Sequence, residues 1–545
     1  MNQGKEETAA TVEPSLRPKK SKKPIIISLA VIVLLGISAT VYALFFSPSP
    51  KEAYFLAEKN TMEQTTEDFR NMFAINEDVN KKALEEPTDT SIDLSLKSIS
   101  GLEAIDPSVA MFSQFFNQIK LNFSTKVDPT NNEGAVDLKV GLGSTEILRA
   151  EAYQSEEVTG LNVPLLYNKY LYMNNSDFGK VMKDIDPAYN GPEQMDNLIK
   201  LQLESLQNQE KLEEKGEEYG EFLFEQVKDE NVTEEDGVKF EGESYKQLTL
   251  ELSEKETKEL IKAFIEKLEK DEETLDLIVD MSMGSNLSTM TMDKEDMKAE
   301  IKKGLDEAKK NLDKAEIPDG FKSVILVDSD NLIVKRDMTF KVGADNEIIN
   351  MNISNHALRT DEVITDGKWE FNAYPEGGEK QEYVKVLLEM KGEKKGEDEM
   401  KRDITGTFAF AESGQVAGAN LNATMTGKPE DMRTEFEISV ENPVQQIPPV
   451  KGHFTRVVTD DLDNGLYAAK GEFGLEADPG LGSPISVVFD YESKTAFKDE
   501  LNFPNVTEDG VNVAELNAQE KQELMSEIQT RIETMMMNGP QLPFK

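Results

Sequence analysis

The sequence predicts an α+β fold: an N-terminal transmembrane helix, followed by two repeats of antiparallel β-sheet with packed helices. Three features support this prediction. The chain opens with an uncharged apolar run at residues 24–46, apolar and polar residues alternate through much of the remaining chain, and several segments have apolar residues at helical spacing. Alternation is typical of strands with one buried and one wet face, whereas apolar residues three and four positions apart are typical of amphipathic helices.

The apolar run at residues 24–46 is long enough to cross a membrane. It contains no charged side chain, and as a helix it would span about 33 Å, which is enough for the hydrocarbon core of a bilayer. A lysine-rich segment at residues 19–23 precedes it. Because basic residues tend to stay on the cytoplasmic side, we expect residues 1–23 to form a cytoplasmic tail. Residues 47–51 are then a linker, and the remaining chain lies outside the cytoplasm.

A cleaved secretory signal is the alternative interpretation of the same run. Val41-Tyr42-Ala43 resembles a weak cleavage site. Signal cores usually contain about 7 to 15 apolar residues, and the run at 24–46 is longer. We therefore favour a retained, single-pass anchor in the cell membrane. Under either interpretation the bulk of the chain is exported.

The composition agrees with export and excludes several kinds of chemistry. The sequence has 60 Lys and Arg against 104 Asp and Glu, for a net charge of −44. Such a domain repels phosphate backbones, so nucleic acid is excluded as a partner. Solubility is the simplest role for the charge, and binding of divalent cations is the alternative. Cysteine is absent, so the chain has no disulfide, thiolate metal site or thiol nucleophile.

We expect the exported part to form two α+β domains, at residues 52–283 and 284–545. The first begins with a helix at 52–73, and the turn at 129–134 predicts a hairpin between two strands. The other elements expected in this domain are strands at 92–97, 121–127, 136–142 and 245–250, two short strands within 163–173 around an Asn168-Lys169 turn, and a charged helix at 195–227 interrupted by Gly216 and Gly220.

The clearest helix of the sequence begins after Ser253. This residue is a natural N-cap, and Glu256 three positions later completes the capping-box pattern. The helix has one apolar stripe at helical spacing, formed by Leu260, Ile261, Phe264, Ile265 and Leu268. We expect the stripe to pack against a sheet.

The second domain repeats this order of elements. Residues 231–238 and 505–511 are also similar in sequence, which suggests a duplication. A final helix at 518–537 has Asn517 as its cap. The other elements expected here are a helix at 294–315 and strands at 323–327, 332–342, 348–353, 368–374, 383–390, 404–410, 416–425, 434–440, 466–475 and 485–491.

Three segments carry a resemblance to a known group of proteins. They are YKQLTLELSEKETKELIKAFIEKLEKDEETLDLI at 245–278, VPLLYNKYLYMNNSDFGKVMKDID at 163–186 and VNVAELNAQEKQELMSEIQ at 511–529. In style the chain resembles membrane-anchored or lipid-modified exported proteins of Gram-positive bacteria, a family of unknown function. That group broadly resembles the lipoprotein-carrier architecture, which implies a curved antiparallel sheet cradling helices. The resemblance carries no catalytic residue over to this chain.

A search for catalytic, cofactor-binding and metal-binding residues selects none. The two histidines, His356 and His453, are isolated in the sequence and are expected to be surface residues at strand ends. Residues 460–465 superficially resemble a calcium loop but lack its spacing, and Asn464-Gly465 favours a hairpin turn. No catalytic motif occurs, so we do not expect an enzyme and expect no cofactor.

The sequence supports three functional hypotheses. The leading one is a membrane-tethered extracytoplasmic binding or interaction protein of the cell envelope, with the membrane contacted through residues 24–46 and an envelope protein as partner. The second is a carrier or sensor of a lipid or other amphipathic ligand, bound in a concave sheet. A large apolar cavity left empty by the protein's own helices favours this second hypothesis, and a filled one favours the first. The third, an envelope hydrolase, requires clustered polar residues around a pocket.

Overall fold

The computed structural model describes residues 49–102, 117–284, 294–344, 347–360, 363–378, 382–396, 399–442, 447–478, 480, 483–508 and 510–538. The predicted anchor at 24–46 and the tail before it lie outside these residues. Within them, no helix combines the length and the apolar character needed to cross a membrane.

The strands of the described chain form one sheet of 20 strands. They are β1 (Thr88–Ser100), β2 (Ile119–Asp128), β3 (Glu133–Leu142), β4 (Thr145–Gln154), β5 (Val158–Val163), β6 (Tyr167–Asn174), β7 (Val232–Phe240), β8 (Glu243–Leu252), β9 (Phe321–Val327), β10 (Ile333–Ala344), β11 (Glu347–Thr360), β12 (Val363–Pro375), β13 (Tyr383–Lys394), β14 (Met400–Glu412), β15 (Gln415–Lys428), β16 (Asp431–Glu441), β17 (Val450–Asp461), β18 (Leu466–Ala477), β19 (Ile485–Phe497) and β20 (Val511–Asn512).

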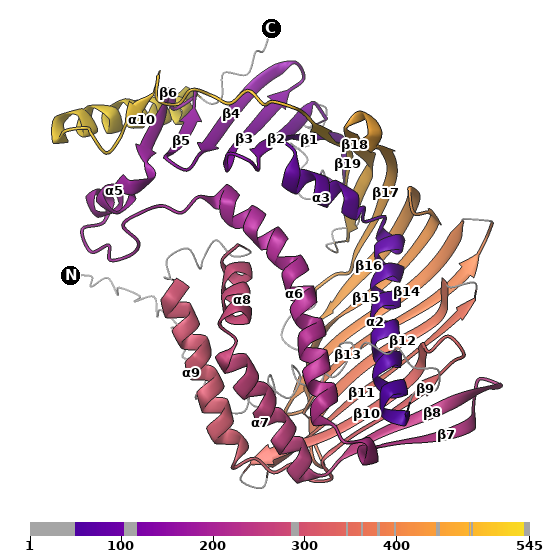
Figure 1. The fold of residues 1–545 in the computed structure, drawn as a ribbon. Coiled ribbons are helices and arrows are strands. Elements are labelled where there is room, and N and C mark those ends of the chain that lie inside the picture. The colour runs from indigo at the N-terminus through magenta and orange to yellow at the C-terminus, as the bar shows by residue number, and fades with distance from the viewer. Residues whose placement is uncertain are drawn as a thin grey trace, which may run out of the picture.

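The helices of the described residues are α2 (Pro50–Phe73), α3 (Glu77–Glu85), α5 (Phe178–Ile185), α6 (Leu198–Gln226), α7 (Glu254–Lys270), α8 (Glu272–Gly284), α9 (Lys294–Leu312) and α10 (Ala518–Asn538). In Figure 1 the sheet is open and curved, and α2, α6, α7, α8 and α9 lie on its concave side. Helices α5 and α10 lie at the end of the sheet formed by β5 and β6.

Strand pairing follows chain order from β7 to β19, and β19 then pairs with β1. Strands β1 to β6 extend the sheet from there, antiparallel throughout, and the short β20 pairs with β6 in parallel. The sheet therefore joins segments that are far apart in the sequence.

The prediction of two separate sheet repeats is wrong, because the sheet is continuous. Strand β1 pairs with β19 from Thr88 opposite Phe497 to Ser100 opposite Ser486, and β8 pairs with β9. Both pairings cross the predicted division at 283 and 284. Alternation along a strand indicates which side chains share a face, but it does not identify the neighbouring strand. The division into domains at 52–283 and 284–545 falls at the end of α8 and stays a prediction.

The segments whose similarity suggested a duplication adopt different structures. Residues 232–240 form β7, whereas residues 506–508 form a turn that precedes the two-residue β20. Two local predictions are also corrected. The turn between β5 and β6 is at Pro164–Leu166 instead of Asn168-Lys169, and α6 continues through both glycines. The sequence patterns missed the strands β4, β7 and β17 and the helices α3, α5 and α8.

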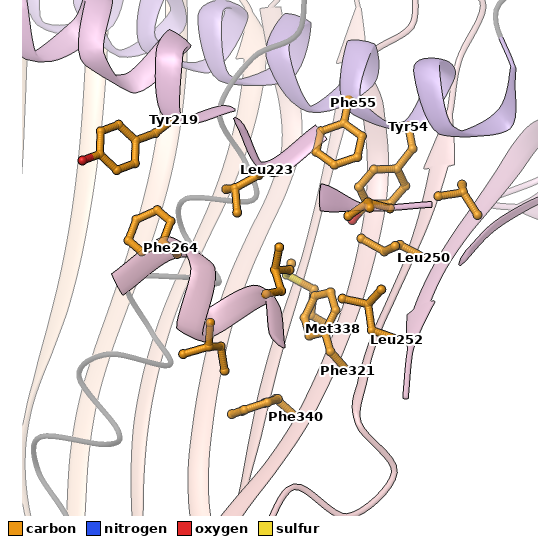
Figure 2. Packing of buried hydrophobic residues seen from close by; sticks show 14 of the residues in the cluster. Tyr54, Phe55, Tyr219, Leu223, Leu250, Leu252, Phe264, Phe321, Met338 and Phe340 are labelled. Atoms are coloured by element: carbon orange, nitrogen blue, oxygen red, sulfur yellow. The ribbon is translucent and has the colours of Figure 1, made fainter. Parts of the chain in front are cut away.

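The main hydrophobic core lies between the helices and one end of the sheet. Figure 2 shows Tyr54 and Phe55 of α2 and Leu223 of α6 near side chains of β8, β9 and β10 such as Phe321, while Phe264 of α7 points toward Tyr219 of α6. The predicted stripe on α7 belongs to this core: Leu260, Ile261, Phe264 and Ile265 are buried, and Leu268 packs against them. The capping box of Ser253 and Glu256 is confirmed.

Candidate ligand-binding face

The two faces of the sheet have different chemistry. Side chains that share a face can be followed from strand to strand through the register, since directly opposed residues lie on the same side. Met351 of the core is opposed to Ala373, which is opposed to Val384, and Phe410 follows on β14. The face that contains these residues is the one that the helices cover, and we call it the concave face.

Away from the core, the concave face remains apolar while the opposite, convex face is polar. The same register assigns to the concave face Phe371, Val386, Leu388, Met390, Ile404, Phe408, Leu421, Ile438, Val440, Phe454, Phe473, Leu475, Phe489, Leu94, Leu121, Phe123 and Leu138. Lys368, Glu370, Asp403, Glu435 and Glu472 lie on the convex face. The convex face therefore meets water.

Part of the concave face is left uncovered by the helices. The side chain of Phe408 is 51% exposed, and Val386, Phe410 and Ile438 are 43%, 42% and 40% exposed. Val386 is directly opposed to Phe408, and Phe410 follows two positions later on β14. We call the group Val386, Phe408, Phe410, Ile438, Val440 and Leu475 the open strip.

Exposure of large apolar side chains on the strands is concentrated on the concave face. Besides the open strip, Phe123, Leu138 and Leu161 are exposed there, and Val457 is the exception on the convex face within the described strands. Contiguous apolar patches are uncommon on soluble monomers and mark sites where something binds. The open strip is therefore the best candidate site.

Helix α2 determines where the covered part of the concave face ends. Its last turn places Met72 against Met390, Met425 and Met432, which are all buried. Methionine side chains adapt to irregular space, which suits a boundary between a packed and an open surface. Beyond this cluster, along β13, β14 and β16, the open strip begins.

Two buried polar contacts hold the N-terminal half of α2 against the sheet. The Tyr54 hydroxyl hydrogen-bonds the Ser323 hydroxyl at 2.7 Å. Glu58, 1% exposed at its side chain, forms an ion pair with Arg336 of β10. Burial raises the pKa of the Glu58 carboxyl, and the Arg336 charge lowers it in part.

The C-terminal half of α2 is tied down by a second ion pair. Asp68 and Arg359 lie 3.0 Å apart, and both are largely buried. Breaking either pair would leave a buried charge without compensation. Helix α2 is therefore fixed across the strands.

A cleft of about 1020 Å³ lies beside α2, where α2 and α3 meet α6 and the ends of β16, β17 and β18. Met62, Leu212 and Tyr467 provide apolar surface there, and Glu63, Glu67, Glu217, Glu430 and Asp460 contribute carboxylates. Asn76 Nδ2 donates to Asp460 Oδ2 at 2.6 Å, which ties the α2–α3 corner to the β17 end.

The two histidines lie on the convex face, on β11 and β17, and the structure does not bring them together. His356 Nε2 is 3.4 Å from Asp366 Oδ1, and His453 Nε2 is 2.7 Å from Glu472 Oε1. Lys97 and His453 lower the pKa of the Glu472 carboxyl through hydrogen bonds. Each histidine belongs to a cross-strand polar pair.

The segment that superficially resembles a calcium loop is a turn. Leu462–Asn464 form a short 3₁₀ turn between β17 and β18, with Gly465 at a φ of 70°, so the hairpin interpretation of residues 460–465 is confirmed. Within the described residues, no group of three or more His, Asp or Glu is arranged to hold a metal ion.

Comparison with known proteins gives no assignment, because no known family matches the chain and no curated protein resembles it in sequence. The site therefore has to be interpreted from its own chemistry.

Proposed function

We propose that this protein is a membrane-tethered, extracytoplasmic binding protein that holds the apolar chain of a lipid on the concave face of its sheet. The observation that supports this proposal is the open strip, where large apolar side chains remain exposed on a face that the helices cover only in part. Residues 24–46 would anchor the protein in the cytoplasmic membrane, with the N-terminus inside. The proposed role is binding, without catalysis.

The dimensions of the open strip suit an acyl chain. It extends from Val386 on β13 to Leu475 on β18. Strands lie about 4.8 Å apart, so five intervals correspond to about 24 Å across the sheet. The acyl chains of one leaflet occupy about 15 Å of a bilayer core that is about 30 Å thick. The strip is therefore wider than one lipid tail is long, and a tail that enters it along a strand or across the strands meets apolar side chains.

Burial of the strip by a ligand is energetically favourable. Removing apolar surface from water contributes about 25 cal/mol per Å². Phe408 and Phe410 are both substantially exposed, and aromatic side chains carry a large apolar area. An envelope protein that laid an apolar segment on the strip would gain the same energy, so the experiment must separate the two occupants.

Mass spectrometry of the purified full chain tests the proposal. The protein is extracted from bacterial membranes in a mild detergent, and lipid retained through extensive washing is quantified. We expect the native chain to retain lipid and Phe408→Asp to lose it, because a carboxylate on the open strip opposes an apolar tail. Thr407→Asp is the matched control, since Thr407 is the preceding residue of β14 and lies on the convex face.

The outcomes are distinct. Lipid retention by the native chain and Thr407→Asp, with loss in Phe408→Asp, supports the proposal. Equal lipid in all three proteins means that the lipid belongs to the anchor, and the proposal fails. Absence of lipid together with an apolar peptide segment bound in a Phe408-dependent way would favour the interaction protein instead. Unchanged thermal unfolding midpoints in both variants confirm that the fold is intact.

A further inference from the structure

The charged residues of the concave face are few and of one sign. On β12 to β19 and β1 to β4, away from the strand ends, the described concave positions contain two charged side chains, Arg402 and Arg456. This is unexpected in a chain with 104 acidic and 60 basic residues. Both arginines lie on strands that also contribute to the open strip or border it.

Arg402 has no direct partner among the described residues. The Asp68 carboxylate of α2 acts on the Arg402 charge electrostatically, but Asp68 already pairs with Arg359 at 3.0 Å. Burial lowers the pKa of the Arg402 guanidinium. An arginine nevertheless keeps its charge at neutral pH, because its ordinary pKa lies far above neutrality. Arg402 is therefore a half-buried cation that no carboxylate of the described residues pairs with directly.

Arg456 differs from Arg402 in this respect. Its guanidinium donates to the Pro429 carbonyl oxygen at 3.1 Å, so it supports the segment before β16. Its Nε is buried and has no hydrogen-bond partner among the described residues. Arg456 therefore has a structural role, and Arg402 is left as the cation that can bind a ligand.

Arg402 lies on β14 directly opposite Met425 of the methionine cluster, so it borders the covered end of an apolar row of side chains that leads to the open strip. Ile404, Gly406, Phe408 and Phe410 follow it on the same face. From Arg402 to Phe408 the strand rises about 20 Å at about 3.4 Å per residue. A β-carbon at Gly406 would meet Leu421 at 3.4 Å with no closer contact, so the glycine leaves a shallow depression between Ile404 and Phe408.

We propose that Arg402 binds the negatively charged head group of the lipid whose tail lies along β14 toward Phe408. This inference rests on the proposed function and deepens it, because it specifies an anionic lipid. A guanidinium forms paired hydrogen bonds with a phosphate or carboxylate, and such bonds are strongest away from water. The acidic surface elsewhere repels an anionic head group, so Arg402 also sets the orientation of the ligand.

The single tryptophan of the chain provides the probe. Trp369 lies on the concave face of β12, and its register partner Leu388 is opposed to Gly406 on β14. Bromine atoms on an acyl chain that follows β14 would therefore come near the indole and quench its fluorescence. The full chain contains no second tryptophan to confuse the signal.

The experiment uses the full chain in phosphatidylcholine vesicles and two probes with the same tail, 9,10-dibromostearate and its methyl ester. Binding is read from Trp369 quenching. We expect Arg402→Gln to weaken binding of the carboxylate by about tenfold or more, as loss of a charged hydrogen bond predicts, and to leave the ester unchanged. Arg433→Gln is the matched control, since Arg433 is on the convex face, pairs with Glu435 at 2.9 Å and changes the net charge equally.

Each result has one meaning. A selective loss of carboxylate binding in Arg402→Gln, restored in part by Arg402→Lys and absent in Arg433→Gln, supports the inference. Quenching by both probes that no Arg402 variant alters overturns the head-group role while the proposed lipid binding stands. Failure of both probes to quench the native chain overturns the proposed function itself.

Discussion

The sheet has two regions that share one sequence pattern and differ in what covers them. On β8 to β10, alternating apolar residues such as Leu250, Phe321 and Phe340 are buried beneath α2, α6 and α7. On β13 to β16 the same alternation places Val386, Phe408 and Ile438 on the same face, and they remain exposed. Alternation alone therefore shows which side chains share a face, and the helices decide whether that face becomes core or surface.

The largest expected loss of stability comes from a substitution in the covered region. Phe264→Asp places a carboxylate in the contact between α7 and α6, where the Phe264 and Tyr219 rings lie 5.3 Å apart. An uncompensated buried charge of this kind costs several kcal/mol. We expect the variant to lose its cooperative thermal transition, measured by circular dichroism. A native-like transition would mean that the α7 stripe is not part of the core, and the two regions would no longer differ in the way described.

A matched pair of truncations measures the difference between the regions directly. Phe321→Ala removes a buried ring and is expected to lower the free energy of unfolding by about 3–5 kcal/mol, whereas Phe408→Ala on the open strip is expected to lower it by less than about 1 kcal/mol. Urea denaturation of both variants provides the measurement. Equal losses would show that the open strip is packed in solution.

The pH dependence of stability tests the contact between α2 and the covered region of the sheet, where Glu58 is buried. Burial raises the pKa of Glu58 above its value in the unfolded chain. The stability that this group contributes is therefore present at low pH and is lost as pH rises through the raised pKa.

Glu58→Gln is expected to abolish that part of the pH dependence. The thermal midpoint of the native chain, relative to Glu58→Gln, should fall as the pH rises above about 4, the ordinary pKa of a glutamate. Asp68→Asn serves as the control, because that change leaves Glu58 and Arg336 in place. A constant difference as the pH rises would contradict the assigned burial of Glu58.

Local structure was largely predictable, for identifiable reasons. Ser253 and Glu256 marked the start of α7, and Asn517 marked the start of α10, because capping residues act over three positions. The hairpin at 129–134 was also predictable, with Asp128 opposite Glu133. These signals are local, and the structure retains them.

Long-range organisation was not predictable from the same signals. Nothing in the alternation of β1 indicates that β19 is its neighbour, so the single sheet was interpreted as two. The open strip was missed for a related reason. Residues such as Val386 and Phe408 have the pattern of core residues, and only the extent of the helices shows that no part of the described chain covers them.

The start of α2 has a mechanical consequence for the whole molecule. Ser49 caps this helix. Polar contacts of α2 residues with Ser323, Arg336 and Arg359 then hold the helix across β9, β10 and β11. If residues 24–46 span the bilayer as we propose, only two residues separate the anchor from the cap of α2. The distance between the concave face and the membrane surface would then be narrowly limited, and a force on the anchor would be transmitted directly to the strands that α2 contacts.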